Sequence, residues 1–248
     1  MKATILSNFH CTYEYPFEAI RTFISQDYGE MAIIMFDDGS PVDDVWKPKF
    51  DKMVARSKAP VTLLQNEERQ GQASARLEMA KAYLAQDPDP DDFVIFFDGD
   101  DKMVGRDCIS KLAKAFEDDN VDFVFGRMIG WPMPQYDDSV NKENVREKPW
   151  ACPHPRAIRA RVLMDAVLEP EMFKHGGEWI MSATDQALWF ELFEQSDVTR
   201  KNIDYVEADM WYRIHAGSNL GSEAQQQKAL SNEKLVRSRN LDFYTGGE

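Results

Sequence analysis

The chain has 248 residues, of which 43% are hydrophobic and 29% are charged, and its formal net charge is −14 at pH 7. A chain of this length can bury a sizeable core as one large domain or two small ones. The acidic balance excludes a protein that attracts nucleic acid or anionic membranes over most of its surface.

Strand-like and helix-like segments alternate along the first half of the chain. Continuous apolar runs predict buried strands, and apolar residues three or four apart predict helices. The expected strands are 3–8, 31–36, 61–64, 93–97 and 121–125, and the expected helices start at Pro16 and after Gly71 and cover 106–118. This alternation predicts an α/β fold with a mostly parallel sheet covered on both faces. Such sheets bind ligands at the carboxyl ends of their strands.

The second half is less regular. The expected elements are a long loop or flap over 130–155, a helix over 184–195, an edge strand over 202–206 and a helical stretch over 223–239. We therefore divide the chain into one domain over 1–222 and a helical C-terminal tail over 223–248. The tail is expected to pack on the domain or to extend from it.

The cysteines and the apolar runs favour a reducing compartment. Cys11, Cys108 and Cys152 form no CxxC pair, which argues against a disulfide framework or a zinc site. No apolar run approaches the roughly 20 residues that cross a bilayer. The segment 1–10 turns polar too quickly for a signal peptide. We expect a cytoplasmic protein without a membrane segment.

An acidic cluster follows the most apolar run, in the stretch FVIFFDGDD (93–101). Like charges as close as those of Asp98, Asp100 and Asp101 raise each other's pKa unless a cation holds them. Side chains two apart on an extended chain point the same way, so Asp98 and Asp100 can reach one ion. Carboxylate oxygens suit Mg²⁺ or Mn²⁺. The plain alternative is an acidic turn in solvent.

Two other kinds of functional site also carry acidic residues in a loop or at the end of a strand. A calcium EF-hand loop counted from Asp98 needs Gly and Glu where Met103 and Ile109 stand, so that reading fails. Phosphotransferases of the haloacid dehalogenase type also carry DxD after an apolar strand. Their pattern asks for Thr or Val where Lys102 stands, which leaves this alternative weak.

Several stretches in series resemble family 2 glycosyltransferases with the GT-A fold, from residue 3 to about 220. They are FEAIRTFISQDYGE (17–30), MAIIMFDDGS (31–40), NEERQGQASARLEMAKAYLA (66–85), FVIFFDGDD (93–101), TDQALWFEL (184–192) and WYRIHAGSN (211–219). The resemblance implies a single Rossmann-like domain. It also implies a hexosyl- or pentosyltransferase that moves a sugar from a nucleotide-diphosphate donor, most often a UDP-sugar, to a hydroxyl acceptor.

The resemblance assigns a donor-binding role to several residues. Asp38, helped by Asp37, matches the acid that contacts the base or ribose, since carboxylates accept from ring N–H and hydroxyl groups. Arg76 matches a helix arginine that faces the base or the phosphates, although Leu77 stands where the family usually has Asn. Arg213 matches a residue that pairs with the diphosphate. A plain turn at 37–40 and a solvated helix arginine are the alternatives.

A divalent metal, Mn²⁺ or Mg²⁺, is the cofactor that the resemblance implies. Asp98 and Asp100 match its ligands and Asp98 also faces the donor, Asp101 assists, and His215 completes the metal shell or contacts phosphate. Such an ion acts as a Lewis acid on the departing diphosphate.

Asp185 matches the general base of the family. It would take the proton from the acceptor hydroxyl as that oxygen attacks the anomeric carbon opposite the diphosphate. A single displacement of this kind inverts configuration. The family often has two adjacent acids here, whereas Thr184 precedes Asp185. The alternative is an acid that a helix N-terminus favours.

A basic stretch stands out in this acidic chain. Trp150, Arg156 and Arg159 belong to it and are possible acceptor or phosphate contacts. They would form a wall that binds phosphate, on the donor or on an anionic acceptor. The alternative is an edge strand and a helix with solvated arginines. A glycan is the expected acceptor, and a modified DNA base, as phage sugar transferases use, is the minority choice because the net charge opposes it.

Two other functions stay open. A catalytically silent nucleotide-sugar-binding protein would keep Asp38, Asp98 and Asp100 but would not need Asp185. A phosphotransferase would form a covalent aspartyl-phosphate at Asp98.

Overall fold

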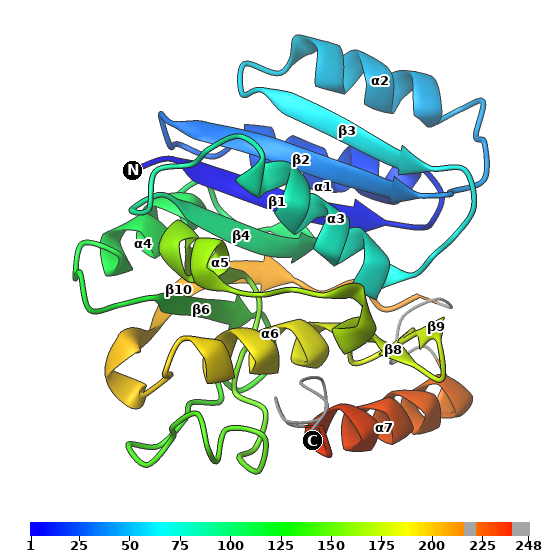
Figure 1. The fold of residues 1–248 in the computed structure, drawn as a ribbon. Helices are drawn as coiled ribbons and strands as arrows, with labels where there is room; N and C mark the ends of the chain where they lie inside the picture. The colour runs from blue at the N-terminus through cyan, green and yellow to red at the C-terminus, as the bar shows by residue number, and fades with distance from the viewer. Residues whose placement is uncertain (216–221, 240–248) are drawn as a thin grey trace.

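The computed structural model describes residues 1–215 and 222–239, and a single large sheet organises them (Figure 1). The order of its strands is β3-β2-β1-β4-β7-β6-β10-β5. The strands are β1 (Ala3–Phe9), β2 (Met31–Asp38), β3 (Val61–Asn66), β4 (Phe93–Asp98), β5 (Lys102–Met103), β6 (Phe123–Met128), β7 (Arg156–Arg159) and β10 (Ile203–Trp211). A separate hairpin joins β8 (Lys174–His175) to β9 (Glu178–Trp179).

Helices cover both faces of the sheet, as the alternating pattern predicts. They are α1 (Glu14–Ile24), α2 (Lys47–Arg56), α3 (Gln72–Leu84), α4 (Cys108–Ala115), α5 (Ala160–Asp165), α6 (Thr184–Gln195) and α7 (Glu223–Arg237), with 3-10 turns η1 (Pro170–Phe173) and η2 (Arg200–Asn202). Figure 1 shows α3, α5 and α6 in front of the sheet and α1 behind it. The α/β fold with a mostly parallel sheet is therefore confirmed.

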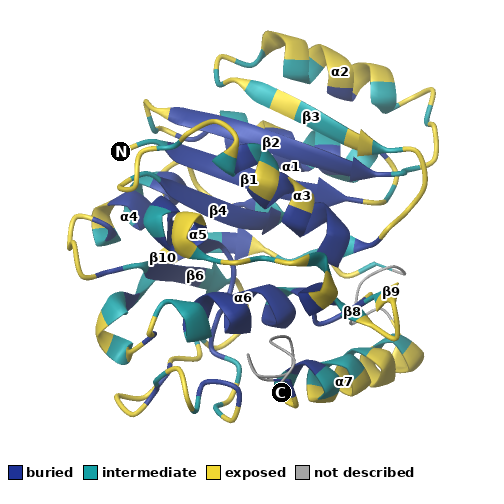
Figure 2. Cartoon of the chain, in the orientation of Figure 1, coloured by how far each residue is buried: buried dark blue, intermediate teal, exposed yellow. Residues whose placement is uncertain are grey.

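The apolar run of β4 explains why the sheet has two cores. Phe93, Ile95 and Phe97 pack into the cluster under α1 and α4, whereas Val94 and Phe96 pack into the cluster under α3 and α6. Side chains alternate between the two faces of a strand, so a strand buried on both faces must be apolar throughout. Figure 2 shows the central strands buried along their length.

All strands of the large sheet run in one direction except β5 and β7. β7 lies between β4 and β6 and is antiparallel to both. The carboxyl ends of β1, β2 and β4 therefore share one edge, where the register places Asn8 beside Asp98 and Phe9 beside Asp37. This register brings the two acidic clusters of the sequence to neighbouring strand ends.

The irregular second half surrounds that edge. Residues 129–155 contain no helix or strand apart from a single bridge between Asn141 and Thr199, so the expected loop is confirmed. The polar tail forms α7, which is held to the body by Asn232 and Arg237. The edge strand expected over 202–206 is β10, which continues to Trp211, and β5 pairs with its last two residues. No helix among the described residues has the length and apolar character that crossing a bilayer requires.

Candidate active site

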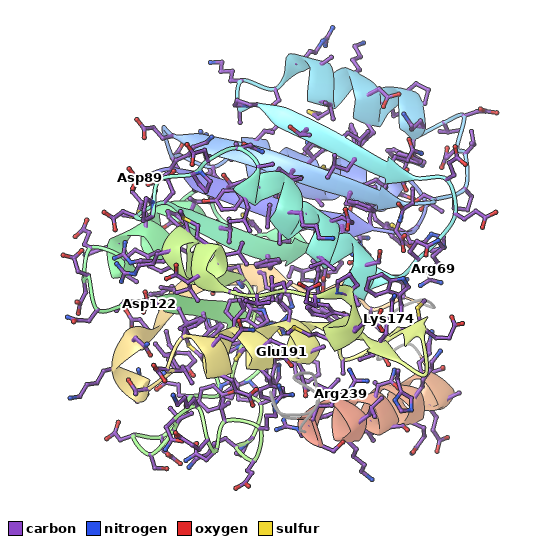
Figure 3. The ribbon with its side chains drawn as sticks, viewed as in Figure 1. Arg69, Asp89, Asp122, Lys174, Glu191 and Arg239 are labelled. Atoms are coloured by element: carbon purple, nitrogen blue, oxygen red, sulfur yellow. The ribbon has the colours of Figure 1, made fainter. Side chains whose placement is uncertain are left out.

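A cavity of about 380 Å³ lies at the carboxyl ends of β1, β2 and β4. The residues that line it include Asn8, His10, Cys11, Asp38, Arg69, Gln72, Asp98, Asp100, Met181, Ser182, His215, Gln225 and Lys228. Figure 3 shows Arg69 at this edge of the molecule and Asp89 and Asp122 at the opposite one. A larger cavity of about 470 Å³ beside Lys2 and Pro60 holds none of the residues that the sequence singled out. We therefore place the site in the smaller cavity.

Asp38 and Asp37 organise the wall of this cavity. Oδ1 of Asp38 accepts from the backbone N–H of Gln70 (2.8 Å) and Oδ2 from that of Gly71 (2.7 Å), so this carboxylate ties the loop before α3 to β2. Asp37 is fully buried behind it and accepts from Tyr13 and from the Ser40 backbone. The structure brings Asp38 to the cavity surface and keeps Asp37 beneath it.

Gly39, in the DDGS turn, is required by the close approach of this loop. Its φ is +68°, and a Cβ would lie 2.8 Å from the backbone nitrogen of Arg69. Only glycine adopts such a conformation at no steric cost.

Arg76 points at Asp98, the carboxylate expected to hold the metal and to face the donor, and not at Asp38, which is expected to contact the nucleotide base. Its Nη2 lies 2.8 Å from Oδ1 of Asp98, and its Nη1 donates to Thr184 (2.9 Å). Burial alone would raise the pKa of the Asp98 carboxyl, but the charge of Arg76, and after it that of Arg156, holds it below its usual range. Arg76 thus joins α3, β4 and α6 at one point.

Asp100 and His215 meet at the mouth of the cavity, with 2.7 Å between Oδ2 and Nε2. Arg213 donates from Nε to the Asp100 carbonyl (2.8 Å), and its guanidinium also pairs with Glu18. Because it is turned toward α1, Arg213 is not among the side chains that line the cavity. Ser218, in the same closing segment, lies outside the described residues.

Asp101 is completely buried behind this pair. Its Oδ1 accepts from the backbone N–H of Arg213 (2.8 Å), and its Oδ2 has no hydrogen-bond partner within the described residues. Burial, reinforced by Asp100 and Asp98, raises the pKa of Asp101 to about 9. Its complete burial and its bond to the Arg213 backbone fit a supporting position behind Asp100.

The donor set fits a divalent cation that takes part of its shell from the substrate. Asp98, Asp100 and His215 offer carboxylate oxygen and imidazole nitrogen to one cavity, which suits Mn²⁺ or Mg²⁺. Over residues 1–215 and 222–239, no three such side chains form a preformed metal cluster. An ion held here would complete its coordination with phosphate oxygens and water.

Asp185 lies in the first turn of α6, directly after Ala183, whose φ is +55°, and Thr184. Its Oδ2 is 2.8 Å from Nη2 of Arg156, and its Oδ1 accepts from the backbone N–H of Gln186 (2.9 Å). Burial would raise the pKa of this carboxyl, but the guanidinium groups of Arg156 and Arg76 hold it at about 2. Asp185 is therefore ionised at neutral pH.

The basic stretch divides between two edges of the sheet. Arg156 is buried beside Asp185, and the Trp150 ring lies 5.4 Å from its guanidinium. Arg159 pairs in register with Phe93 at the amino end of β4, where its Nε donates to the Val121 carbonyl (2.8 Å). The structure does not bring Arg159 to the site, and no exposed wall of arginines forms.

His154 was missed by the sequence analysis. It is 5% exposed, its Nε2 lies 3.7 Å from Oδ2 of Asp98, and its Nδ1 has no partner in the described chain. Burial, and next Arg156, lowers the pKa of His154 to about 3, so the imidazole is neutral. A lone histidine between two prolines carries no local signal for this placement. Gln225 and Lys228 of α7 were also missed, because no local sequence signal marks them as residues that line the cavity.

Acidic side chains at the carboxyl ends of a mostly parallel sheet, together with an ionised acid at a helix start, are the arrangement expected of a GT-A glycosyltransferase. The family model for glycosyl transferase family 2 matches residues 14–184. The chain therefore belongs to glycosyl transferase family 2 and is a glycosyltransferase. No curated protein sequence matches the chain.

Solved structures carry the same fold. S. aureus TarS 1–349 in complex with UDP-GlcNAc is 17% identical, with a TM-score of 0.62 over 97% of this chain and 68% of that one. Mannosyltransferase PcManGT from Pyrobaculum calidifontis, in complex with GDP-Man and Mn²⁺, is 13% identical, with a TM-score of 0.62 over 96% and 65%. GalNAc-T7 with UDP, GalNAc and Mn²⁺ is 13% identical, with a TM-score of 0.56 over 93% and 47%. At these identities the likeness shows the fold alone.

Proposed function

We propose that the chain is a metal-dependent, inverting glycosyltransferase that moves a sugar from a UDP-sugar to a hydroxyl group of a glycan. The observation that carries this proposal is the arrangement of Asp98, Asp100 and His215 in one cavity. The ionised Asp185 follows Thr184 at the start of α6, and Arg76 links Thr184 to Asp98. The complexes of the structural neighbours with UDP-GlcNAc, GDP-Man and Mn²⁺ support the donor class and the metal.

The donor nucleotide is bound at the ends of β2 and β4. Asp38 faces the base or ribose, with Asp37 fixing the turn beneath it. Arg76 holds Asp98 toward the diphosphate, and Arg213 supports Asp100 through its carbonyl. Asp98, Asp100 and His215 hold Mn²⁺ or Mg²⁺, which when bound acts as a Lewis acid on the leaving diphosphate.

Asp185 is the general base. It accepts the proton of the acceptor hydroxyl while that oxygen forms a bond to the anomeric carbon and the bond to the diphosphate breaks on the opposite face. One displacement inverts the configuration at this carbon. An ionised carboxylate is the form that can accept this proton, and the Arg156 pair keeps Asp185 in that form.

A glycan acceptor fits the chain better than DNA, because a net charge of −14 repels a polyanion. A modified DNA base of the phage type remains the second candidate acceptor. We keep the division into a domain over 1–222 and a tail over 223–248, with α7 closing one side of the cavity through Gln225 and Lys228. Three free cysteines fit a reducing compartment such as the cytoplasm.

The test is a panel of nucleotide sugars with Mn²⁺, read first by thermal shift and then by transfer and hydrolysis. We expect a UDP-sugar to raise the melting temperature only with the metal, and Asp185→Asn to bind the donor while losing turnover. The control is Asp165→Asn, which changes an exposed acid on α5. Binding without any turnover by wild type would favour the silent binding protein. A covalent phosphate on Asp98, seen by mass spectrometry, would favour the phosphotransferase.

A further inference from the structure

Arg156 occupies a costly position in the fold. It is the first residue of β7 and pairs in register with Phe96 of β4 and Phe125 of β6, in the middle of the sheet. The residue is 4% exposed. A buried arginine is destabilising unless it is paired and its N–H groups are hydrogen-bonded. The partners of its guanidinium therefore indicate the function of this buried arginine.

Three contacts fix the guanidinium of Arg156 in one place. Nε donates to the Cys152 carbonyl (2.6 Å), Nη2 lies 2.8 Å from Oδ2 of Asp185, and the Trp150 ring lies 5.4 Å away. Trp150 is itself held edge-on against Phe190 of α6. The arginine is thus held in place by partners within the chain before any substrate arrives.

The carboxylate of Asp185 is oriented at both oxygens. Arg156 engages Oδ2, and the Gln186 backbone N–H engages Oδ1. Each carboxylate oxygen keeps further acceptor capacity, and the Asp185 side chain is 25% exposed. The group is therefore aimed yet able to accept a proton. A base oriented by a third group is a recurrent arrangement in enzymes.

We propose that Arg156 is the positioning residue of the Asp185 base. Arg156 holds the carboxylate in the orientation for proton transfer and keeps it ionised. This inference rests on the proposed function of Asp185. It replaces the expected role of Arg156 as a phosphate contact, and it gives Trp150 the role of a platform beneath the arginine.

The charges around Asp185 define what the loss of Arg156 would do. The groups that face it are Arg156 from β7, Arg76 from α3, His154 and Cys152 from the segment before β7, and Asp98 from β4. Burial raises the pKa of Asp185, and Arg156 is the foremost of the groups that lower it. Without Arg156, the proton affinity of the base rises and its orientation is lost.

The experiment compares Arg156→Gln, Arg156→Lys, Asp185→Asn and the double variant Arg156→Gln/Asp185→Asn. The control is Arg161→Gln, which breaks an arginine–aspartate pair with Asp122 at the far edge of the sheet. The measurements are kcat/KM from about pH 3 to about pH 8, and the affinity for a UDP-sugar with Mn²⁺.

For Arg156→Gln we expect a loss of about 100-fold in kcat/KM at neutral pH, with donor affinity retained. The acid limb of its pH profile is expected to move up by about one unit or more. Arg156→Lys, which keeps the charge but not the fork, should restore the position of the limb and part of the rate. The double variant should be no slower than Asp185→Asn, because both changes remove one function.

A pH profile that Arg156→Gln leaves unchanged would overturn the inference, as would a full additional loss in the Asp185→Asn background. If wild type transfers sugar and either of these contradicting results appears, the proposed function stands and only the positioning role of Arg156 is rejected. If wild type transfers no sugar, the proposed function itself is rejected. Should Arg156→Gln not fold, ¹³C-carboxyl NMR of wild type decides, with the Asp185 signal assigned by its loss in Asp185→Asn. A carboxyl of Asp185 that titrates above about pH 4 in folded wild type contradicts the proposal.

Discussion

The guanidinium of Arg76 lies 2.8 Å from the carboxylate of Asp98, and this pair connects the middle of the α3 helix to the tip of the central strand β4. Both side chains are largely buried, at 6% and 18% exposure. Since Arg76 also donates to Thr184, the first acid of the DxD motif and the helix of the candidate base share one support.

Replacing Arg76 by Gln should therefore lower the free energy of unfolding by about 3 kcal/mol, because Asp98 would be left as a buried charge without its main partner. Urea denaturation measures this change. The matched control is Lys81→Ala on the same helix, whose pair with Glu78 is half exposed on both sides; it should cost less than about 0.5 kcal/mol. Equal effects of the two substitutions would contradict a structural role for the Arg76–Asp98 pair.

The stability supplied by Asp185 should depend on pH in the acid range. Its pKa is about 2 in the folded chain, against about 3.9 when unfolded. A depressed pKa contributes stability that is fully present above the unfolded value and is lost as pH falls through the folded value. We expect Asp185→Asn to be less stable than wild type by about 2 kcal/mol at neutral pH. That difference should shrink toward zero as pH falls to about 2; a constant difference across this window would show that the carboxyl is not held by charge.

Gly39→Ala should disturb the donor side of the cavity. A Cβ at this position would lie 2.8 Å from the Arg69 backbone, at a φ of +68°, so we expect a loss of about 1–3 kcal/mol and weaker donor binding. Gly29→Ala is the control, because nothing lies within 4 Å of its added Cβ; it should be neutral or stabilise by up to about 1 kcal/mol. Thermal unfolding with and without donor distinguishes the two, and an unchanged Gly39→Ala would mean that the loop before α3 moves freely.

Mn²⁺ affinity should depend on the pair at the mouth of the cavity. Asp100→Asn and His215→Ala are each expected to weaken the Mn²⁺-dependent thermal shift by about tenfold or more in metal concentration. His175→Ala, on the β8–β9 hairpin, is the control. A chelator should abolish turnover by wild type and should leave the fold intact. If His215→Ala binds Mn²⁺ as wild type does, His215 acts on phosphate alone.

Local pattern was sufficient for most of the sheet and insufficient for its centre. The strands β1, β2 and β4 are continuous apolar runs, and their burial on both faces follows from that pattern. β7 reads as a charged segment, yet all four of its residues are buried. Its arginines are stable there because they bond to carbonyls and to Asp185, and two of those partners, Val121 and Asp185, lie tens of residues away in sequence. α2 was also missed, because Phe50 alone among its residues is buried.

The same limit applies to the site. The positions of Asp98, Asp100 and Asp185 follow from strand ends and a helix start, which local sequence marks. Their partners do not. Arg76 was expected to face the base or the phosphates, and its guanidinium lies on Asp98. Arg156 was expected to contact the acceptor or a phosphate, and its guanidinium lies on Asp185. A pairing between buried charges is decided by which elements the topology brings together, and a single sequence holds no record of that choice.

The antiparallel strand between β4 and β6 has a consequence for the order in which the protein is made. In chain order β6 precedes residues 156–159, and its other partner, β10, follows them. The growing chain can therefore pair β3, β2, β1 and β4 early, whereas β6 has no strand partner until β7 emerges. Pairings between distant segments close late and leave such edges open to misassembly. The insertion that closes the gap also delivers Arg156. Because Asp185 and β10 follow β7 in the chain, the arginine is made before the carboxylate that it braces.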